Sequence, residues 1–492
     1  MKPGIKLRLT LFLLLAGLAL ALQSERVFNG QASAADKAVF PLKVSANGRY
    51  LVDQSNTPFF IHGDSPWSAI AQLHLAGERG ATATNTWDYY LTNRQAKGFN
   101  AVIVNAIENE FSATPPKDIL GNLPFNAGDT WWSNAFNTAQ INNAYWARVD
   151  SFVAKAKAKG MAVFMNPAYY GSRPAAGWSA ELAAANAKGW GYAYGQWLGN
   201  RYKVSAYDNI VWVLAGDHEV PAGDARTGQL AILAGLEAAA PDMLKTAHFK
   251  RTKLSLDDAD YRPYMDLDAV YVGPANGAHQ GMKAYNRGES HRPSFLWEAY
   301  YEDDKLFDET PADLRRFAYT AALTGSTGHF YGQGSGRPVF SGVWPFGPDW
   351  VSKLDLPGTL DMAHVRSVFV AGNRNWWRLA PKFGAEIIAS GNEALSQTSN
   401  TFISSARRDD GKLVMIYVPE TDSATRQFTV NMTNLVGTPV NHRWFNPNEG
   451  TYSTAAPTCN SGCPTSKIFT TPGNNGNGKD LLLILDVGTP TN

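Results

Sequence analysis

The chain has 492 residues, of which 44% are hydrophobic and 18% are charged. This length is too great for one hydrophobic core and predicts a large domain with a smaller one. The formal net charge of +1 argues against a generic polyanion binder, so we expect no nucleic-acid partner. Aromatic residues make up 12% of the chain and include 15 Trp. They either fill a large core or serve as platforms for sugar rings.

The N-terminus has the pattern of a secretory signal peptide. Lys2, Lys6 and Arg8 precede an apolar run over residues 9–22, which contains a small-x-small cleavage site at residues 19–21. We expect a signal peptide over residues 1–22, a flexible leader over residues 23–38, and a secreted or periplasmic protein. A retained N-terminal anchor is the alternative. No later segment reaches the roughly 18 apolar residues of a membrane span, so we expect no membrane contact after cleavage.

The only two cysteines, Cys459 and Cys463, lie in a turn rich in Gly, Ser and Asn. Export favours a local disulfide, although the sequence leaves open whether the two are bonded. Because no histidine is nearby, they make a poor zinc site.

A β-hairpin and eight short apolar runs follow the leader. The hairpin is predicted over residues 42–52, where apolar and polar residues alternate on both sides of Asn47-Gly48. Continuous apolar runs of this length fit parallel strands that are buried on both faces. The eight runs are 59–64, 101–105, 161–166, 209–217, 245–249, 269–273, 294–298 and 328–332.

Helical patterns separate several of these runs. They cover residues 87–98, 145–157, 180–202, 227–240 and 312–323, whereas the stretches after the fifth and sixth runs are less clearly helical. Eight strands alternating with helices predict a (β/α)8 TIM barrel over residues 39–380, with the hairpin at its start. A doubly wound open sheet is the competing fold, but no Gly-x-Gly-x-x-Gly fingerprint follows an early strand. After residue 380, apolar runs at 385–389, 413–418, 427–430 and 481–485 look like strands, and Asn-, Gly-, Thr- and Pro-rich gaps separate them. They predict a small β-sandwich over residues 381–492.

Catalytic groups of a TIM barrel lie at the C-terminal ends of its strands. Asp217 ends the fourth run and Glu298 the seventh, so the two carboxyl groups lie on opposite sides of the expected barrel mouth. Glycosidic bond cleavage needs one carboxyl group to protonate the leaving oxygen and a second one opposite it. This pair therefore predicts a glycoside hydrolase that acts on an oligo- or polysaccharide.

Other residues near strand ends are candidates for the substrate site. Some of the aromatic ones either stack on the sugar or pack in the barrel, and Glu302 either orients Glu298 or is a solvated loop acid. The candidates are Asp64, Trp67, Asn105, Asn166, Tyr169, His218, Trp297, Tyr300, Glu302 and Tyr331.

The sequence lacks the complete motifs of other enzyme classes. His218-Glu219 begins like a zinc-protease motif, but the second His is missing and Pro221 would break the helix. There is no Gly-x-Ser-x-Gly elbow, no phosphate-binding loop and no cluster at metal-ligand spacing. We expect no metal and no cofactor.

Four segments resemble the apiosidase-like glycoside hydrolases (glycoside hydrolase family 140). They are PFFIHGDSPW at residues 58–67, RQAKGFN at 94–100, NIVWVLAGD at 209–217 and WEAYYE at 297–302. The family's usual C-terminal partner, a β-domain labelled as collagen-binding, is similar to RWFNP at 443–447 followed by Gly450. The resemblance extends from about residue 42 to the end of the chain.

The resemblance implies roles for particular residues. Asp217 corresponds to the family's general acid/base and Glu298 to its nucleophile, which implies a retaining mechanism. An inverting mechanism with Glu298 as the base for water is the alternative. Asp64 and Trp67 correspond to sugar-site residues. The family's known target, apiose in rhamnogalacturonan II, implies a plant cell-wall substrate.

Two departures from the family pattern bear on which sugar is bound. Ser65-Pro66 replaces the usual Thr-Ala, and residues 271–279 replace a Gln-Ser-Gly-His-like turn. A non-catalytic carbohydrate- or matrix-binding protein on the same scaffold is the alternative function.

Overall fold

The computed structural model describes residues 37–490 apart from 129, 131, 174–175, 274, 306, 308, 335–340 and 474–478. The expected signal peptide and the leader up to residue 36 lie outside the described residues. Within the described part of the chain, no helix is long and apolar enough to cross a membrane.

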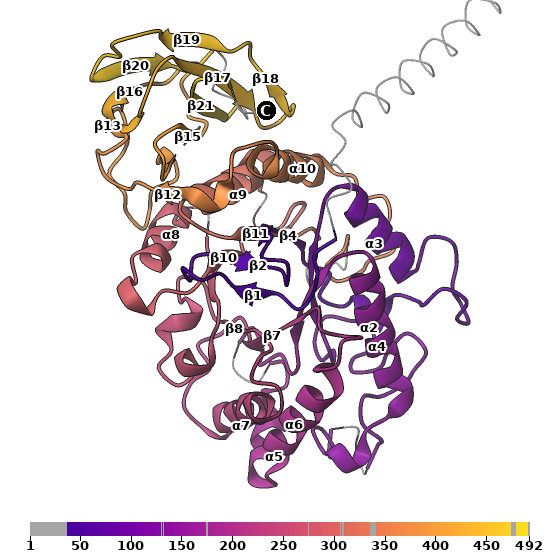
Figure 1. Ribbon diagram of the computed structural model, residues 1–492. Helices are drawn as coiled ribbons and strands as arrows, with labels where there is room; N and C mark the ends of the chain where they lie inside the picture. Colours follow the sequence, from indigo (N-terminus) through magenta and orange to yellow (C-terminus); the bar gives the residue numbers. More distant parts are fainter. Residues whose placement is uncertain are drawn as a thin grey trace, which may run out of the picture. The chain divides into compact units, whose positions relative to one another are not determined.

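Eight parallel strands form a nearly closed barrel, ringed by helices (Figure 1). Their order is β8-β7-β6-β5-β4-β11-β10-β9, and the last strand in sequence, β11, returns to pair with the first, β4. The predicted (β/α)8 barrel is therefore confirmed, and the doubly wound sheet is not observed. The strands are β4 (Ile61–Asp64), β5 (Ala101–Asn105), β6 (Ala162–Asn166), β7 (Ile210–Ala215), β8 (Lys245–His248), β9 (Asp268–Tyr271), β10 (Ser294–Glu298) and β11 (Gly328–Tyr331).

A serine bridges β8 and β9, the two ends of this strand order. The Ser255 hydroxyl donates to the carbonyl of Ala247 at 2.6 Å and accepts from the N–H of Ala269 at 2.9 Å. These bonds satisfy backbone groups that a regular ladder would otherwise pair.

Helices connect most of the strands. The expected helix over residues 180–202 is two helices, because Gly189 adopts a φ of 68° and interrupts it. Only the short 3-10 turns η2 (Ser255–Asp257) and η3 (Arg262–Tyr264) follow β8, whereas a helix follows β9. The helices are α2 (Ala69–Gln72), α3 (Trp87–Ala96), α4 (Asn143–Ala158), α5 (Ser179–Ala187), α6 (Trp190–Tyr202), α7 (Asp224–Ala239), α8 (Gly277–Tyr285), α9 (Pro311–Leu323) and α10 (Pro357–Val370).

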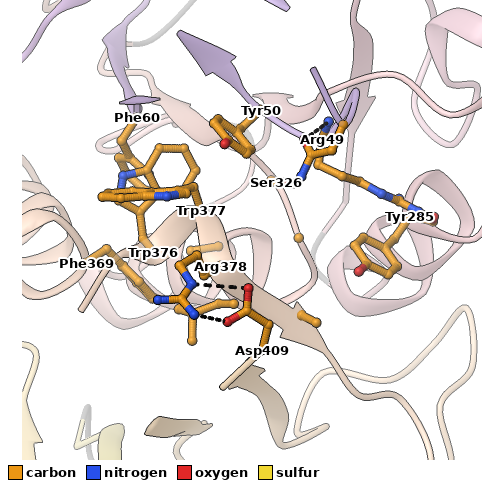
Figure 2. Close-up of a pocket in the computed structure, with 15 residues that line it drawn as sticks. Arg49, Tyr50, Phe60, Tyr285, Ser326, Phe369, Trp376, Trp377, Arg378 and Asp409 are labelled. Atoms are coloured by element: carbon orange, nitrogen blue, oxygen red, sulfur yellow. Dashed lines mark hydrogen bonds and ion pairs between the residues drawn. The ribbon is translucent and has the colours of Figure 1, made fainter. Parts of the chain in front are cut away.

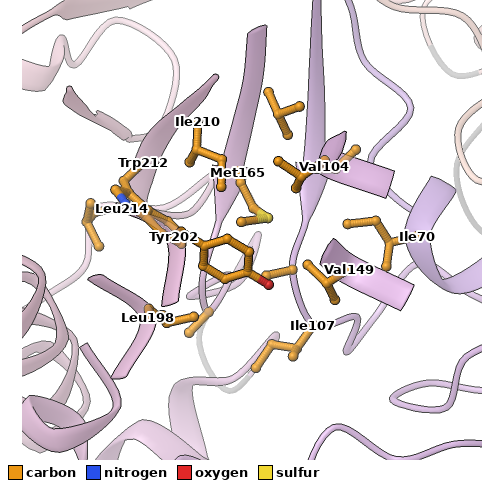
Figure 3. Packing of buried hydrophobic residues seen from close by; sticks show 14 of the residues in the cluster. Ile70, Val104, Ile107, Val149, Met165, Leu198, Tyr202, Ile210, Trp212 and Leu214 are labelled. Carbon is orange, nitrogen blue, oxygen red and sulfur yellow. The ribbon is translucent and has the colours of Figure 1, made fainter. Parts of the chain in front are cut away.

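Side chains alternate between the inside and the outside of the barrel along each strand. On β5, Ile103 belongs to the cluster that fills the barrel, whereas Val104 packs outward against the helices. Figure 3 shows this outer layer, in which Met165 and Trp212 of the strands meet Leu198 of α6. Both faces of each strand are buried, which explains the continuous apolar runs in the sequence.

The predicted hairpin is present, with Lys43 opposite Val52, and packs against the N-terminal end of the barrel. It consists of β1 (Lys43–Val44) and β2 (Leu51–Val52), and β3 (Pro58–Phe59) extends it to three strands. Leu51 lies in the cluster that fills the barrel, and its N–H donates to the Thr327 hydroxyl at 3.3 Å.

The C-terminal region forms two antiparallel sheets, as expected for a β-sandwich. The larger sheet has the order β12-β14-β15-β21-β17-β18, with β19 paired to β17, and the smaller has the order β13-β16-β20. Cys459 and Cys463 form a disulfide. The strands are β12 (Leu379–Pro381), β13 (Ile388–Ser390), β14 (Ser404–Arg408), β15 (Leu413–Val418), β16 (Gln427–Asn431), β17 (Val440–Asn446), β18 (Thr451–Tyr452), β19 (Ala456–Cys459), β20 (Ser466–Thr470) and β21 (Leu481–Val487). The remaining 3-10 turns are η1 (Thr138–Gln140), η4 (Gly288–Ser290), η5 (Trp376–Arg378) and η6 (Met432–Asn434).

The larger sheet is buried on both faces because one face packs on the smaller sheet and the other on α9 and α10. Val414 and Ile416 of β15 face the sandwich core, whereas Met415 and Tyr417 join the cluster that contains Tyr319 of α9. The rings of Tyr319 and Tyr417 stack with their centroids 5.1 Å apart. The β-domain is therefore packed firmly against the barrel.

Candidate active site

Asp217 lies just beyond the C-terminal end of β7. The Tyr271 hydroxyl of β9 donates to Oδ2 of Asp217 at 3.4 Å, and the backbone N–H of Asp217 donates to the Tyr169 hydroxyl at the same distance. The backbone of Gly216 lies close to that of Gly171. Only glycine fits there, because a Cβ at residue 216 would lie 2.7 Å from the backbone nitrogen of Gly171. The preceding residue, Ala215, has a φ of 66°. Strained backbone of this kind is common where a functional side chain must be aimed.

A β-bulge aims Glu298 at the same centre. On β10, Leu296 pairs with Val270 and Glu298 with the next residue, Tyr271, so Trp297 is the extra residue of the bulge. Regular alternation would turn Glu298 outward, on the side of Leu296. With the bulge, Trp297 fills the barrel and Oε2 of Glu298 lies 2.9 Å from Nε2 of His248. The Glu298 side chain is 12% exposed, so it remains accessible to a ligand.

His248, at the end of β8, lies next to Glu298 and is close enough to Asp217 for its charge to act on that acid. Its ring stacks on Trp67, with the centroids 5.7 Å apart and the planes at 28°, and it also contacts Tyr271 and Trp297. The aromatic rings fix the imidazole in place, and its positive form lowers the pKa of Asp217. His248 therefore interacts with both acids, by a close contact with Glu298 and through its charge with Asp217.

The environment of Asp217 favours its protonated form. Burial, and after it the nearby charge of Glu298, raises the pKa of Asp217 to about 7, against the opposing charges of His248 and Arg251. A carboxyl group that keeps its proton near neutral pH suits a general acid.

Three tyrosines around the pair stay protonated. Burial, followed by the charges of the two carboxyl groups, raises the pKa of Tyr169 and of Tyr271 well above the usual value. Burial and the charge of Glu298 do the same for Tyr301, whose hydroxyl accepts from Nε1 of Trp67 at 2.7 Å. Their hydroxyls are neutral at physiological pH and can donate hydrogen bonds to a carboxylate or to a sugar.

The positively charged side chain of Arg251 lies beside this centre. Nη1 of Arg251 donates to the Tyr300 hydroxyl at 3.2 Å, and the guanidinium lies 4.4 Å from the Tyr300 ring centroid and 5.3 Å from that of Tyr271. The pKa of Asp217 is lowered by this charge, so Arg251 contributes to the electrostatics of the acid.

Part of the predicted substrate-site set gathers around the two acids. Trp67, Tyr169 and Tyr300 have the contacts described above, and His218 follows Asp217 directly. Asn105 and Asn166 lie opposite each other at the ends of β5 and β6.

Asn166 braces the backbone of the site. Its Oδ1 accepts from the N–H of Ala168 at 3.0 Å, and its Nδ2 donates to the carbonyl of Ala215 at 3.2 Å. It therefore fixes the turn that carries Asp217. Trp297 is fully buried inside the barrel, so it supports the site from below and has no face open to a sugar.

Asp64 lies outside this cluster. It is fully buried, its Oδ2 lies 2.6 Å from Nε of Arg94 on α3, and it accepts from the Tyr90 hydroxyl at 2.5 Å. Along β4, Ile61 and Gly63 face the inside of the barrel, so alternation turns Asp64 toward the helix. Its observed contacts are those of a structural ion pair.

Tyr331 and Glu302 also lie outside the cluster. The Tyr331 hydroxyl donates to Oε2 of Glu302 and accepts from Thr359, and the N–H of Gly358 donates to Oε1 of Glu302 at 2.7 Å. Glu302 thus binds the free N–H groups at the start of α10, which attaches this helix to the barrel.

Four residues of the centre were not among the predicted site residues: His248, Tyr271, Tyr301 and Arg251. His248 and Tyr271 end the observed strands β8 and β9, but the apolar runs in the sequence continue to residues 249 and 273, so the strand-end rule did not select them. Oε2 of Glu110 is buried without a hydrogen-bond partner among the described residues, and the charge of Glu110 helps to raise the pKa of Tyr169. In the described part of the chain, no three His, Cys, Asp or Glu side chains are grouped to hold a metal ion.

The chain is similar to known glycosidases along most of its length. Residues 45–378 match the family described as "Apiosidase-like, catalytic domain", and residues 386–486 match the "Putative collagen-binding domain of a collagenase". No curated protein matches the chain.

Two solved structures share the fold. One described as a glycoside hydrolase has 21% sequence identity and a TM-score of 0.72, over 92% of this chain and 99% of its own. A glycoside hydrolase family 5 protein from Bacteroides vulgatus ATCC 8482 has 19% identity and a TM-score of 0.70, over 91% and 93%. The family match covers well over half of the chain and includes both Asp217 and Glu298. The protein therefore belongs to the apiosidase-like family and is a glycoside hydrolase.

Proposed function

We propose that this enzyme is secreted and removes a sugar from a polysaccharide side chain by a retaining mechanism. Glu298 is the nucleophile and Asp217 the general acid/base. The observation that carries this proposal is the shared environment of the two acids, in which Tyr271 binds Asp217 at 3.4 Å and His248 lies 2.9 Å from Glu298.

In the first step, the Asp217 carboxyl group protonates the leaving oxygen while a carboxylate oxygen of Glu298 attacks the anomeric carbon. The glycosidic C–O bond breaks, and a covalent glycosyl ester forms on Glu298. In the second step, Asp217, now ionised, takes a proton from water. The resulting oxygen attacks the anomeric carbon and releases both the sugar and the Glu298 carboxylate.

The surroundings support this division of roles. The raised pKa of Asp217 keeps a proton available for the leaving group. Glu298 faces His248 and the neutral hydroxyl of Tyr301, which stabilise a carboxylate that must be ionised to attack.

The first test compares the wild type with Glu298→Gln on rhamnogalacturonan II, arabinan and galactan. Released sugars are identified by chromatography and mass spectrometry. The wild type should release one sugar and the variant should be slower by about 10²–10⁴-fold. Equal release by both proteins would remove Glu298 from the mechanism. Proton NMR of the first-formed anomer decides between retention and inversion.

Secretion is supported by the charged and apolar pattern of residues 1–22. Expression of the full chain in a bacterium, followed by N-terminal sequencing of the exported protein, should show cleavage near Ala21. A protein that stays in the cytoplasm with its N-terminus intact would contradict export.

A further inference from the structure

Figure 2 shows the residues that line a cavity of about 190 Å³. Tyr50 of the β1–β2 turn, Phe60 before β4 and Ser326 before β11 line it, and all three lie at the N-terminal side of the barrel strands. Asp217 and Glu298 lie at the C-terminal ends. The cavity is therefore separate from the catalytic centre.

Aromatic side chains form much of its wall. Figure 2 shows Trp376 and Trp377 on one side and Tyr285 on the other. Trp376 meets Tyr50 and Trp377 edge to face, with centroids 6.0 and 6.1 Å apart, and these contacts hold the rings in place. Trp377, Tyr50 and Tyr285 are each partly exposed, so they have surface left for a ligand.

The polar groups of the wall have unused hydrogen-bonding capacity. Nε and Nη2 of Arg378 pair with the two carboxylate oxygens of Asp409 at 3.1 and 2.5 Å, yet the side chains are 37% and 57% exposed. Arg49 lies 4.1 Å from the Tyr285 ring centroid and donates to the Tyr285 carbonyl at 2.7 Å. A guanidinium has five N–H donors and a carboxylate about four acceptor sites, so each group can also bind a ligand.

This chemistry fits one sugar residue. Sugars have apolar faces that stack on aromatic rings, and neighbouring hydroxyls that need a donor and an acceptor side by side, which an Arg–Asp pair supplies. The volume is below the roughly 300–1,000 Å³ of pockets for drug-sized ligands, as expected for a single ring.

We propose that this cavity is a second carbohydrate site, which holds one glycosyl residue of the polysaccharide away from the cleavage site. Trp377 and Tyr50 provide the stacking surface, and Arg378, Asp409 and Arg49 bind the hydroxyls. The site keeps the polymer attached between catalytic events and raises its local concentration. Its role during catalysis rests on the proposed function, whereas binding at the cavity is measured without cleavage.

Affinity gel electrophoresis tests this site with rhamnogalacturonan II, arabinan and galactan in the gel. The parent protein carries Glu298→Gln so that the polymers stay intact. In this background, Trp377→Ala and Arg49→Met each remove one part of the cavity wall, and Trp377→Phe keeps an aromatic ring. Tyr192→Ala, at a tyrosine of α6 that is 43% exposed and outside the cavity, is the matched control. Thermal unfolding verifies that each variant is folded.

At least one polymer should retard the parent. Trp377→Ala and Arg49→Met should each raise the apparent dissociation constant by about 2- to 10-fold, Trp377→Phe should raise it less, and Tyr192→Ala should leave it unchanged. The proposal is overturned if no polymer retards the parent, if the cavity variants bind as the parent does, or if Tyr192→Ala weakens binding equally. Each cavity variant differs from the same Glu298→Gln parent at one residue away from Asp217 and Glu298, so these outcomes report on the cavity and not on the catalytic roles.

Discussion

Nε2 of His248 lies 2.9 Å from Oε2 of Glu298, and this contact exists because of the β-bulge at Trp297. Without the extra residue, Glu298 would point outward from the barrel. The bulge and the histidine together determine where the proposed nucleophile is held.

We therefore predict that His248→Ala lowers kcat by about 10²-fold, because a misplaced reacting group costs a factor of this order. His248→Gln, which keeps a hydrogen-bond donor, should recover part of the loss. The measurement is kcat and KM on the sugar substrate found in the glycan panel.

The matched control is His329→Ala. His329 of β11 is as deeply buried as His248, but it faces outward and meets Phe60. A loss of stability without a specific loss of kcat is expected there. If His248→Ala and His329→Ala lower kcat equally, His248 has no positioning role.

Activity should fall as the pH rises through about 7. In the proposed mechanism Asp217 carries its proton in the first step, and burial raises the pKa of this group to about 7. A pH profile of kcat/KM measures the basic limb. A profile that stays flat up to pH 9 would contradict the role of Asp217 as the acid.

Arg251→Met should move this basic limb to higher pH. The positive charge of Arg251 lowers the pKa of Asp217, so its removal lets that pKa rise further. Arg292→Met is the control, because Arg292 is exposed and lies before β10, at the other end of the barrel. A shift to lower pH, or the same shift in both variants, would contradict this prediction.

A buried ion pair attaches the β-domain to the barrel. Nε and Nη2 of Arg315 on α9 bind Oδ1 of Asp480 at 2.9 and 2.5 Å, and Nη1 binds Asp361 at 2.6 Å. Arg315→Met would leave two buried carboxylates without their cation, so we expect a loss of about 3–5 kcal/mol in the free energy of unfolding. Chemical denaturation measures this loss.

The control for that experiment is Lys155→Met. Lys155 pairs with Asp88 at 2.8 Å, but the side chains are 30% and 39% exposed, so the expected loss is about 0–1 kcal/mol. Equal losses in the two variants would mean that burial does not determine the strength of the Arg315 pair.

Most of the barrel could be predicted from the sequence because buried parallel strands leave a direct pattern. Residues 101–105 and 294–298 form strands with the predicted bounds. In the β-domain, the apolar runs that became β15 and β21 were predicted. β14 and β17, which carry polar residues on one face, were missed.

Asp217 and Glu298 could be proposed from the sequence because both acids end apolar runs, whereas the direction of a side chain at a strand end was not visible. Asp64 and Tyr331 also end strands, but regular alternation turns them toward the helices. Glu298 would have turned the same way without the bulge, and no residue pattern in the sequence announces that bulge. Contacts between distant segments, such as Trp67 with His248, depend on the closed barrel and could not be read from local sequence.

The most direct test of the central claim is azide rescue of two alanine variants on an aryl glycoside of the identified sugar, whose phenolate leaves without a general acid. In Asp217→Ala, Glu298 still forms the glycosyl ester, and azide then displaces it. The product should therefore be a glycosyl azide with the anomeric configuration of the substrate. In Glu298→Ala, azide attacks the substrate directly, so the glycosyl azide should have the opposite configuration. The roles assigned to Asp217 and Glu298 would be contradicted if Asp217→Ala gave the inverted glycosyl azide and Glu298→Ala the retained one. They would also be contradicted if neither variant gave an azide product.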